Sequence, residues 1–295
     1  MDRFQAMITF IRVVDTGSFS AAARQINVGQ PAVSKLIAQL EDRLGVRLIT
    51  RTTRGLSPTE AGQRFYERAR RALDEADEAE LAARGAGRGL TGRLRISAAT
   101  TFARLHVFPH LPAFLDEHPE LELEVIMDDR VVDMIEEGID IALRMGALAD
   151  SAATARKLAA GRRSVLATPA YLERAGTART PAELAGHEAI VYTRYETPTW
   201  TFRNAAGGEA SVAVGGRLRV SAAEGLRAAV LADMGLAVAS DWMFAPELES
   251  GAVVRLLDDW NLPPIDLWAL FPAGRLATAK ARSFADLMTN AMRAR

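Results

Sequence analysis

The residues of this sequence with the clearest chemical capacity are polar side chains spaced along one predicted helix near the N-terminus. Gln30, Ser34, Lys35 and Gln39 share one face of it. The opposite face carries apolar residues at the spacing of a core-facing helix, namely Val33, Leu36, Ile37, Leu40 and Leu44. A face of hydrogen-bonding side chains without apolar bulk suits a helix that reads base edges and phosphates in the DNA major groove. A solvated helix surface is the alternative interpretation, so the neighbouring elements decide between the two.

A polar, basic stretch follows this helix after Gly45. Val46–Ile49 alternates like a strand, and residues 50–55 form a loop rich in arginine and threonine. The alternation and the loop predict a two-stranded wing. Arg51 and Arg54 would then reach phosphates or a minor groove, where the negative potential favours arginine.

Two helices are predicted ahead of the polar helix. The first ends at Gly17 and has an apolar stripe formed by Phe4, Met7, Ile8, Ile11 and Val14. Ser18 is a suitable cap for the second helix, Phe19–Ile26, whose alanines allow a neighbouring helix to approach closely. Residues 27–29 form a short turn, because Asn and Gly tolerate left-handed backbone angles, and Pro31 suits a first helical turn. The segment therefore predicts a helix-turn-helix.

The charge of the chain is unevenly distributed. Residues 1–73 contain 12 Lys and Arg against 6 Asp and Glu, a net charge of +6, whereas the whole 295-residue chain carries −1. The other 222 residues therefore carry −7. A basic segment on an acidic body is expected where one segment meets a polyanion, although basic solvated faces are also common.

A long helix is predicted after the wing. Ser57–Glu60 has the cap, the first-turn proline and the capping-box spacing of a helix start. The helix could run to about Ala83, roughly 40 Å at ~1.5 Å per residue. Its apolar positions are Ala61, Phe65, Ala69, Ala72, Leu73 and Ala76. A long helix with so few apolar positions packs better against a copy of itself than alone, so we expect a homodimer, and the glycine-rich stretch 84–92 predicts a hinge.

The rest of the chain alternates short apolar runs with helical patterns, which indicates an α/β fold with largely parallel sheets. The predicted strands are Leu94–Ser97, Leu121–Met127, Ile139–Leu143, Val165–Ala167, Ile190–Tyr192, Leu218–Ser221, Leu236–Ala239 and Leu267–Phe271. The predicted helices are Phe102–Glu117, Val131–Glu137, Ala223–Asp233 and Ala277–Met292. Asp128 and Asp129 are expected to cap the second of these helices.

The N-terminal residues resemble the LysR-type transcriptional regulators. The likeness is carried by Thr16-Gly-Ser-Phe-Ser-Ala-Ala-Ala-Arg24, Gln30-Pro-Ala-Val-Ser34, Gln39-Leu-Glu-Asp-Arg-Leu-Gly45, Leu48-Ile-Thr-Arg-Thr52 and Leu56-Ser-Pro-Thr-Glu-Ala-Gly62. The resemblance implies a transcription regulator that binds double-stranded DNA at an interrupted palindrome as a homodimer or homotetramer. The residues that we expect at the DNA are Ser18, Ser20, Gln30, Pro31, Ala32, Ser34, Lys35, Arg51, Thr52 and Arg54. Gly29 departs from the Ser or Thr common in the family, which weakens a helix cap by ~1 kcal/mol or less.

The C-terminal part resembles the effector-binding module of the same family, which is similar to periplasmic binding proteins. The likeness is carried by Gly92-Arg-Leu-Arg-Ile-Ser97, Phe108-Pro-His-Leu-Pro-Ala-Phe114, Asp140-Ile-Ala-Leu-Arg144 and Ala167-Thr-Pro-Ala-Tyr-Leu172. It implies two α/β lobes with a ligand cleft between them. We expect a winged helix-turn-helix over 1–59, a linker and dimerisation helix with hinge over 60–92, and an effector-binding domain over 93–295, its first lobe at 93–161 and 267–295 and its second at 162–266.

Five residues are the candidates for contact with a small-molecule effector: Thr100, Thr101, Arg144, Thr193 and Ser221. In open α/β sheets, ligands lie beyond the carboxyl ends of strands and near helix N-termini, and each of these residues adjoins such an end. Thr101 also takes the position at which the resembling proteins have a Ser or Thr that contacts effector. For each residue alone, a helix cap or a surface position is an almost equally good interpretation.

No catalytic or metal-binding constellation is evident. His106 and His110 have the spacing of a helical metal pair, but Pro109 and Pro112 interrupt the helix and no carboxylate pair completes a ligand set, so we expect neither metal nor cofactor. The absence of cysteine excludes disulfides and thiolate chemistry. The N-terminus lacks the pattern of a signal peptide and no apolar run is long enough to span a membrane, so we expect a cytoplasmic protein without a membrane partner. The alternative functions are an intracellular solute-binding protein or an enzyme on the two-lobed fold.

Overall fold

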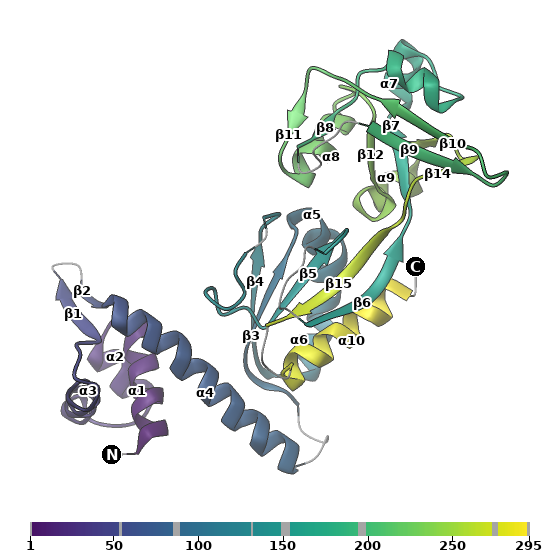
Figure 1. Ribbon diagram of the computed structural model, residues 1–295. Helices are drawn as coiled ribbons and strands as arrows, with labels where there is room; N and C mark the ends of the chain where they lie inside the picture. The colour runs from purple at the N-terminus through teal and green to yellow at the C-terminus, as the bar shows by residue number, and fades with distance from the viewer. Residues whose placement is uncertain are drawn as a thin grey trace. The chain divides into compact units, whose positions relative to one another are not determined.

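The computed structural model describes residues 2–52, 55–84, 89–130, 132–148, 154–193, 199–272 and 277–293. The chain divides into two compact units, Met1–Gly92 and Arg93–Arg295, which are described separately (Figure 1). Across the described ranges, no helix combines the length and the apolar character needed to cross a membrane.

The N-terminal unit is a helix-turn-helix with a two-stranded wing and a long following helix. Its elements are α1 (Arg3–Thr16), α2 (Phe19–Gln25), α3 (Gln30–Leu44), β1 (Ile49–Thr52), β2 (Gly55–Pro58) and α4 (Glu60–Arg84). The predicted end of α1 and the predicted cap of α2 are confirmed. Gly17 ends α1 in the left-handed region, and the Ser18 hydroxyl accepts a hydrogen bond from Ala21 N (3.3 Å). Asn27 has φ +53° in the turn, and Pro31 lies in the first turn of α3.

The apolar stripe predicted for α1 is only partly correct. Ile11 is buried, but Phe4 is 50% exposed, and the residues of α1 in the core are Ala6, Phe10 and Val13. The reason is the position of α4, whose Phe65 packs edge-on against Phe10 with 5.3 Å between ring centroids. Leu44, the last residue of α3, is also exposed, because the helix ends there and the chain turns at Gly45.

The wing is confirmed but starts later than predicted. Residues 46–48 are not part of a strand; β1 begins at Ile49 and pairs antiparallel with β2, so Arg51 faces Leu56 across the ladder. The following helix also begins later, at Glu60, and its first turn is capped by Thr59, whose hydroxyl accepts a hydrogen bond from Gly62 N (2.9 Å). Gly62 allows the first turn of α4 to pack closely against the backbone at Leu48, because a Cβ at position 62 would lie 1.9 Å from the backbone oxygen of Leu48.

One lobe of the C-terminal unit, here lobe I, is built on a five-stranded sheet of order β4-β3-β5-β15-β6. Its strands are β3 (Thr91–Ala98), β4 (Glu120–Met127), β5 (Ile141–Met145), β6 (Thr154–Gly161) and β15 (Ile265–Phe271). Its helices are α5 (Thr100–Phe102), a π-helical turn Ala103–Val107, a 3-10 turn Phe108–His110, α6 (Leu111–Glu117) and α10 (Ala279–Arg293). Phe114 of α6 packs edge-on against Phe284 of α10 beside the sheet.

The described residues of the other lobe, lobe II, form three small sheets, β12-β7-β13, β11-β8 and β10-β9-β14. Its strands are β7 (Arg163–Ala167), β8 (Val191–Tyr192), β9 (Thr199–Asn204), β10 (Glu209–Ala213), β11 (Arg219–Val220), β12 (Ala237–Ser240), β13 (Val254–Leu256) and β14 (Trp260–Asn261). Its helices are α7 (Pro169–Ala175), α8 (Ala223–Leu231) and α9 (Ala245–Ser250), with 3-10 turns at Pro181–Gly186 and Asp241–Phe244. β6 and β15 run side by side between the lobes, and Ile265 pairs with Gly161 where they leave lobe I (Figure 1).

The eight predicted strands of the C-terminal unit are confirmed, with shifted ends, but the pairing is less parallel than predicted. β3 and β5 are parallel, as are β8 and β11, whereas β15 is antiparallel to both of its neighbours. This follows from the course of the chain, because β15 returns from lobe II in the direction opposite to β6. Strands β6, β9, β10, β13 and β14 were not predicted.

Two of the helix predictions need correction. Residues 134–138 form turns instead of the predicted helix, since Asp133 accepts hydrogen bonds from Ile135 N and Glu136 N (2.8 and 3.0 Å), which closes a turn; Val131, where that helix was predicted to begin, lies outside the described residues. The helix predicted over 102–117 is helical throughout but changes form, with a π-helical and a 3-10 segment ahead of α6. Pro109 and Pro112 lack the N–H groups that a regular α-helix would use there.

Candidate DNA-contacting helix and interlobe pocket

The polar face predicted for α3 lies at the surface. Gln30, Pro31, Ala32 and Lys35 are exposed and Ser34 is half-buried. On the opposite side, the core residues of α3 are Val33, Ile37 and Leu40. α3 therefore presents donors and acceptors outward from a helix whose apolar face anchors it.

The remaining residues expected at the DNA lie in several places. Ser20 is exposed on α2, whereas Ser18 is half-buried and is engaged as the cap of that helix. Arg51 and Thr52 belong to β1. Arg54 lies outside the described residues. Gly29 is the N-cap of α3 and provides no side-chain hydrogen bond there, as its departure from the family pattern predicted.

The wing is held to α3 by Glu41, a residue that was not predicted from the sequence. This carboxylate is buried, with 7% of its side chain exposed. It accepts hydrogen bonds from Leu48 N (2.7 Å) and Ile49 N (3.1 Å), and from Arg47 Nη1 (2.8 Å). Burial alone would raise the pKa of Glu41, but the two backbone hydrogen bonds and Arg47 hold it below its ordinary value. The carboxylate is therefore ionised at neutral pH and positions the start of β1.

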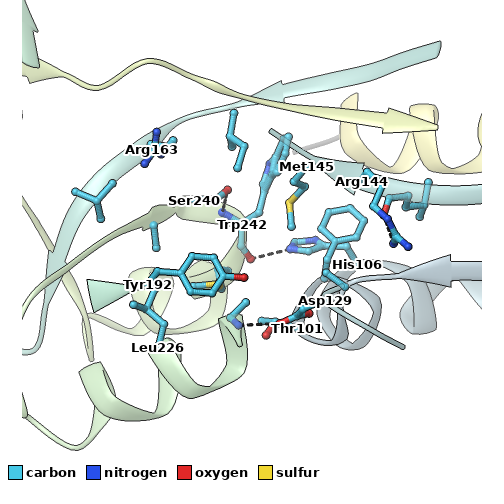
Figure 2. Close-up of a pocket in the computed structure, with 18 of the residues that line it drawn as sticks. Thr101, His106, Asp129, Arg144, Met145, Arg163, Tyr192, Leu226, Ser240 and Trp242 are labelled. Carbon is cyan, nitrogen blue, oxygen red and sulfur yellow. Dashed lines mark hydrogen bonds between the residues drawn. The ribbon is translucent and has the colours of Figure 1, made fainter. Parts of the chain in front are cut away.

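A pocket of about 120 Å³ lies between lobes I and II. Lobe I contributes residues of α5, the π-helical turn and β5, and lobe II contributes residues of α8, β12 and the turn after it (Figure 2). The wall is formed mainly by apolar side chains, among them Phe102, Leu143, Met145, Leu226, Val238 and Trp242.

The structure brings two of the five expected effector residues to this wall. Thr101 and Arg144 line the pocket, and Arg144 Nη2 donates to Ser97 Oγ (2.8 Å). Thr100, Thr193 and Ser221 are not among the residues that line it. Thr193 and Ser221 are exposed at the ends of the paired strands β8 and β11, where the Thr193 hydroxyl donates to Val220 O (3.2 Å).

Asp129 joins the two lobes at the edge of the pocket, instead of capping a helix after itself as predicted. Its Oδ1 accepts a hydrogen bond from Thr100 N of lobe I (3.0 Å), and its Oδ2 accepts one from Ala223 N of lobe II (2.8 Å). These are the first residues of α5 and α8, so one carboxylate caps two helices. Figure 2 shows Asp129 at the edge of the pocket. The neighbouring Asp128 instead accepts hydrogen bonds from Arg130, which lower the pKa of Asp128 to about 2.

A second carboxylate, Glu224 of α8, reaches lobe I beside Asp129. Thr101 Oγ1 donates to Glu224 Oε2 (2.7 Å), and Arg104 Nη2 lies 3.3 Å from Glu224 Oε1. Partial burial raises the pKa of Glu224, but the Thr101 hydrogen bond and the charges of Arg104 and Arg227 outweigh it and hold the pKa below its ordinary value. Thr101 is therefore bonded to an ionised side chain of the other lobe.

His106 makes a third link between the lobes. It is buried in the π-helical turn, its ring 5.0 Å from that of Phe102, and its Nε2 lies 2.7 Å from Trp242 O of lobe II (Figure 2). Within the described part of the chain, no group of three or more His, Cys, Asp or Glu is placed to hold a metal ion. π-helical turns are rare in proteins, and those that do occur are often found at functional sites. This one places His106 in the pocket wall.

These links could not be predicted from the sequence. Asp129 and Glu224 are ordinary acidic residues in their local sequence, and their partners are 94 and 123 positions away along the chain. The available signal was limited to position: Asp129 follows β4, Glu224 is in the first turn of α8, and strand ends of this kind were the places where ligand contacts were expected.

A helix-turn-helix with a wing, joined to a two-lobed α/β unit with an interlobe pocket, defines a class of DNA-binding proteins that respond to small molecules. Residues 4–63 match the bacterial regulatory helix-turn-helix protein of the lysR family, and residues 87–293 match the LysR substrate binding domain. The chain belongs to the LysR family of transcriptional regulators.

Similar proteins span nearly the whole chain. The transcriptional regulator PtxR of Pseudomonas aeruginosa is 34% identical over 281 residues, which cover 95% of this chain and 90% of PtxR. The structure of CrgA, a LysR-type regulator of Neisseria meningitidis, has 30% identity and a TM-score of 0.59, and the match covers 98% of this chain and 96% of that one. The full-length structure of AphB, a virulence activator of Vibrio cholerae, has 28% identity and a TM-score of 0.58, with 98% and 99% covered.

Proposed function

We propose that this regulator reads its operator with the exposed face of α3 and responds to a small molecule held in the interlobe pocket. The proposal that α3 reads the operator rests on the arrangement of this helix, which has Gln30 and Lys35 exposed and its apolar side in the core. Phosphate contacts supply most of the affinity of such a protein and base contacts its specificity. We propose contacts from Ser20, Gln30, Ser34 and Lys35, with support from the wing.

We also propose where the protein acts, how it assembles and what its effector does. The protein acts in the cytoplasm, where its DNA partner is found, and it binds an interrupted palindrome as a homodimer or homotetramer, since a two-fold pair of recognition helices reads two half-sites. α4 is 25 residues long and is proposed as the dimerisation helix. Residues 1–59, 60–92 and 93–295 are proposed as DNA-binding, linker and effector-binding segments. The effector changes DNA binding and is not turned over.

Replacement of Lys35 by alanine is expected to weaken operator binding by about tenfold or more, in line with the 1–3 kcal/mol roughly associated with one specific contact. The operator is first isolated by selecting genomic fragments with the purified protein, and affinities are then compared at matched salt. Arg12→Ala is the matched control, because Arg12 is an exposed cation on α1 of the same unit. Equal affinities for Lys35→Ala and the unaltered protein would exclude Lys35 from the DNA interface.

A further inference from the structure

The size and lining of the interlobe pocket restrict what it can hold. Its volume of about 120 Å³ is near that of a cavity of roughly 150 Å³ that accepts benzene. Phe102, Met145 and Leu226 are among the apolar side chains of its wall, together with the ring of Trp242. A molecule of about one ring therefore fits, and most of its surface would meet apolar atoms.

The polar groups in the wall already have partners within the protein. Asp129 accepts two backbone N–H groups, and the Thr101 hydroxyl is bonded to Glu224. His106 is bonded to Trp242 O, and Arg144 to Ser97. The other polar lining residues also have partners: Asp128, Arg163, Tyr192 and Ser240.

The helix N–H groups and the hydroxyl with which a cleft of this kind would hold an anion are taken up by the protein's own carboxylates. The N–H groups that open α5 and α8 face Asp129, and the Thr101 hydroxyl faces Glu224. An incoming carboxylate would have to displace Asp129 or Glu224 and leave a charge in the wall without its hydrogen bonds, which is costly in a partly buried site.

A cation gains no advantage either. The wall holds two arginines, Arg144 and Arg163, and two aspartates, Asp128 and Asp129, so its formal charges balance. The carboxylates that would attract a cation are already satisfied by N–H and O–H donors.

We infer that the effector of this regulator is an uncharged, largely apolar molecule of about single-ring size, because Asp129 and Glu224 occupy the N–H and O–H groups that would bind an anion, and because the two arginines of the wall balance its two aspartates, so that neither sign of charge is favoured. The inference rests on the proposed function, since it takes the interlobe pocket as the effector site.

The test uses three compounds of equal size and different charge, namely benzyl alcohol, benzoate and benzylamine, titrated into the full-length protein at pH 7 with saturation-transfer NMR and calorimetry. Benzyl alcohol is expected to bind about tenfold or more tightly than either charged compound, because neither charged group can reach an internal partner without displacing another. Benzoate or benzylamine binding as tightly as benzyl alcohol, or no binding by any of the three, would contradict the inference.

Two variants separate the ligand class from the location of the site. Glu224→Gln removes the charge beside Thr101, and it is expected to raise the affinity for benzoate relative to benzyl alcohol several-fold. Val238→Phe fills the pocket and is expected to abolish binding of benzyl alcohol; Leu226→Phe serves the same purpose should the first variant not fold. Benzoate binding that the filled pocket abolishes would overturn the ligand class alone, whereas benzyl alcohol binding that survives both filled variants would overturn the proposed effector site.

Discussion

Replacement of Glu41 by alanine is expected to lower the free energy of unfolding of the N-terminal unit by about 3 kcal/mol. Glu41 is buried beneath the start of the wing, and its removal leaves the N–H groups of Leu48 and Ile49 without their acceptor. A buried, unpaired donor costs about 1–3 kcal/mol, and hydrogen bonds to a charged group are among the strongest. Calorimetry of the full chain, with hydrogen exchange over residues 46–58, measures the effect.

The Glu41 effect also has a defined dependence on pH. Because the folded-state pKa lies below the ordinary value of 4.5, the ionised carboxylate stabilises the fold above that value, and this contribution is lost as pH falls through the folded pKa. The difference between the unaltered protein and Glu41→Gln should therefore be constant near pH 7 and narrow below 4.5. Asp42→Asn is the control, since Asp42 is exposed on the same helix and should change stability little. Equal stability of Glu41→Ala and Asp42→Asn would contradict the role given to Glu41.

The N-terminal unit was predictable because its signals are local. A cap at Ser18, a left-handed turn at Asn27 and a proline in the first turn of α3 each act within a few residues of themselves. The apolar face of α1 was less predictable. Apolar residues lie on more than one side of α1. The contact between Phe10 and Phe65, which are 55 positions apart, selects which of these residues enter the core.

The pocket was predictable only in outline. Thr101 and Arg144 were found because they end strands or open helices, which is where α/β folds place ligands. Thr193 and Ser221 satisfy the same rule but lie at the surface, since strand ends alone do not tell which side of a lobe faces its partner. The carboxylates that cross the pocket depend on the closure of two lobes, and no local pattern encodes that closure.

Asp129 links the two lobes directly at the pocket, so its loss should destabilise their arrangement. Asp129→Ala is expected to destabilise the C-terminal unit by about 2–3 kcal/mol, because a single carboxylate accepts the first N–H group of α5 in lobe I and of α8 in lobe II. Each of these bonds is charge-assisted and lies at a helix N-terminus, where a negative charge is favourable. Asp129→Asn should retain part of the stability, since its amide oxygen still accepts a hydrogen bond but carries no charge.

Denaturant unfolding and hydrogen exchange of the full-length variants distinguish this interlobe role from a local one. Exchange should accelerate at residues 100–103 and at 223–226 together, although these segments are in different lobes, because the same side chain protects both. The matched control is Asp258→Ala, which removes an exposed carboxylate paired with Arg162 (2.8 Å) and should cost less than about 1 kcal/mol. Acceleration confined to one lobe would mean that Asp129 caps a single helix in solution, and the closed arrangement of the pocket would then depend on Glu224 and His106 instead.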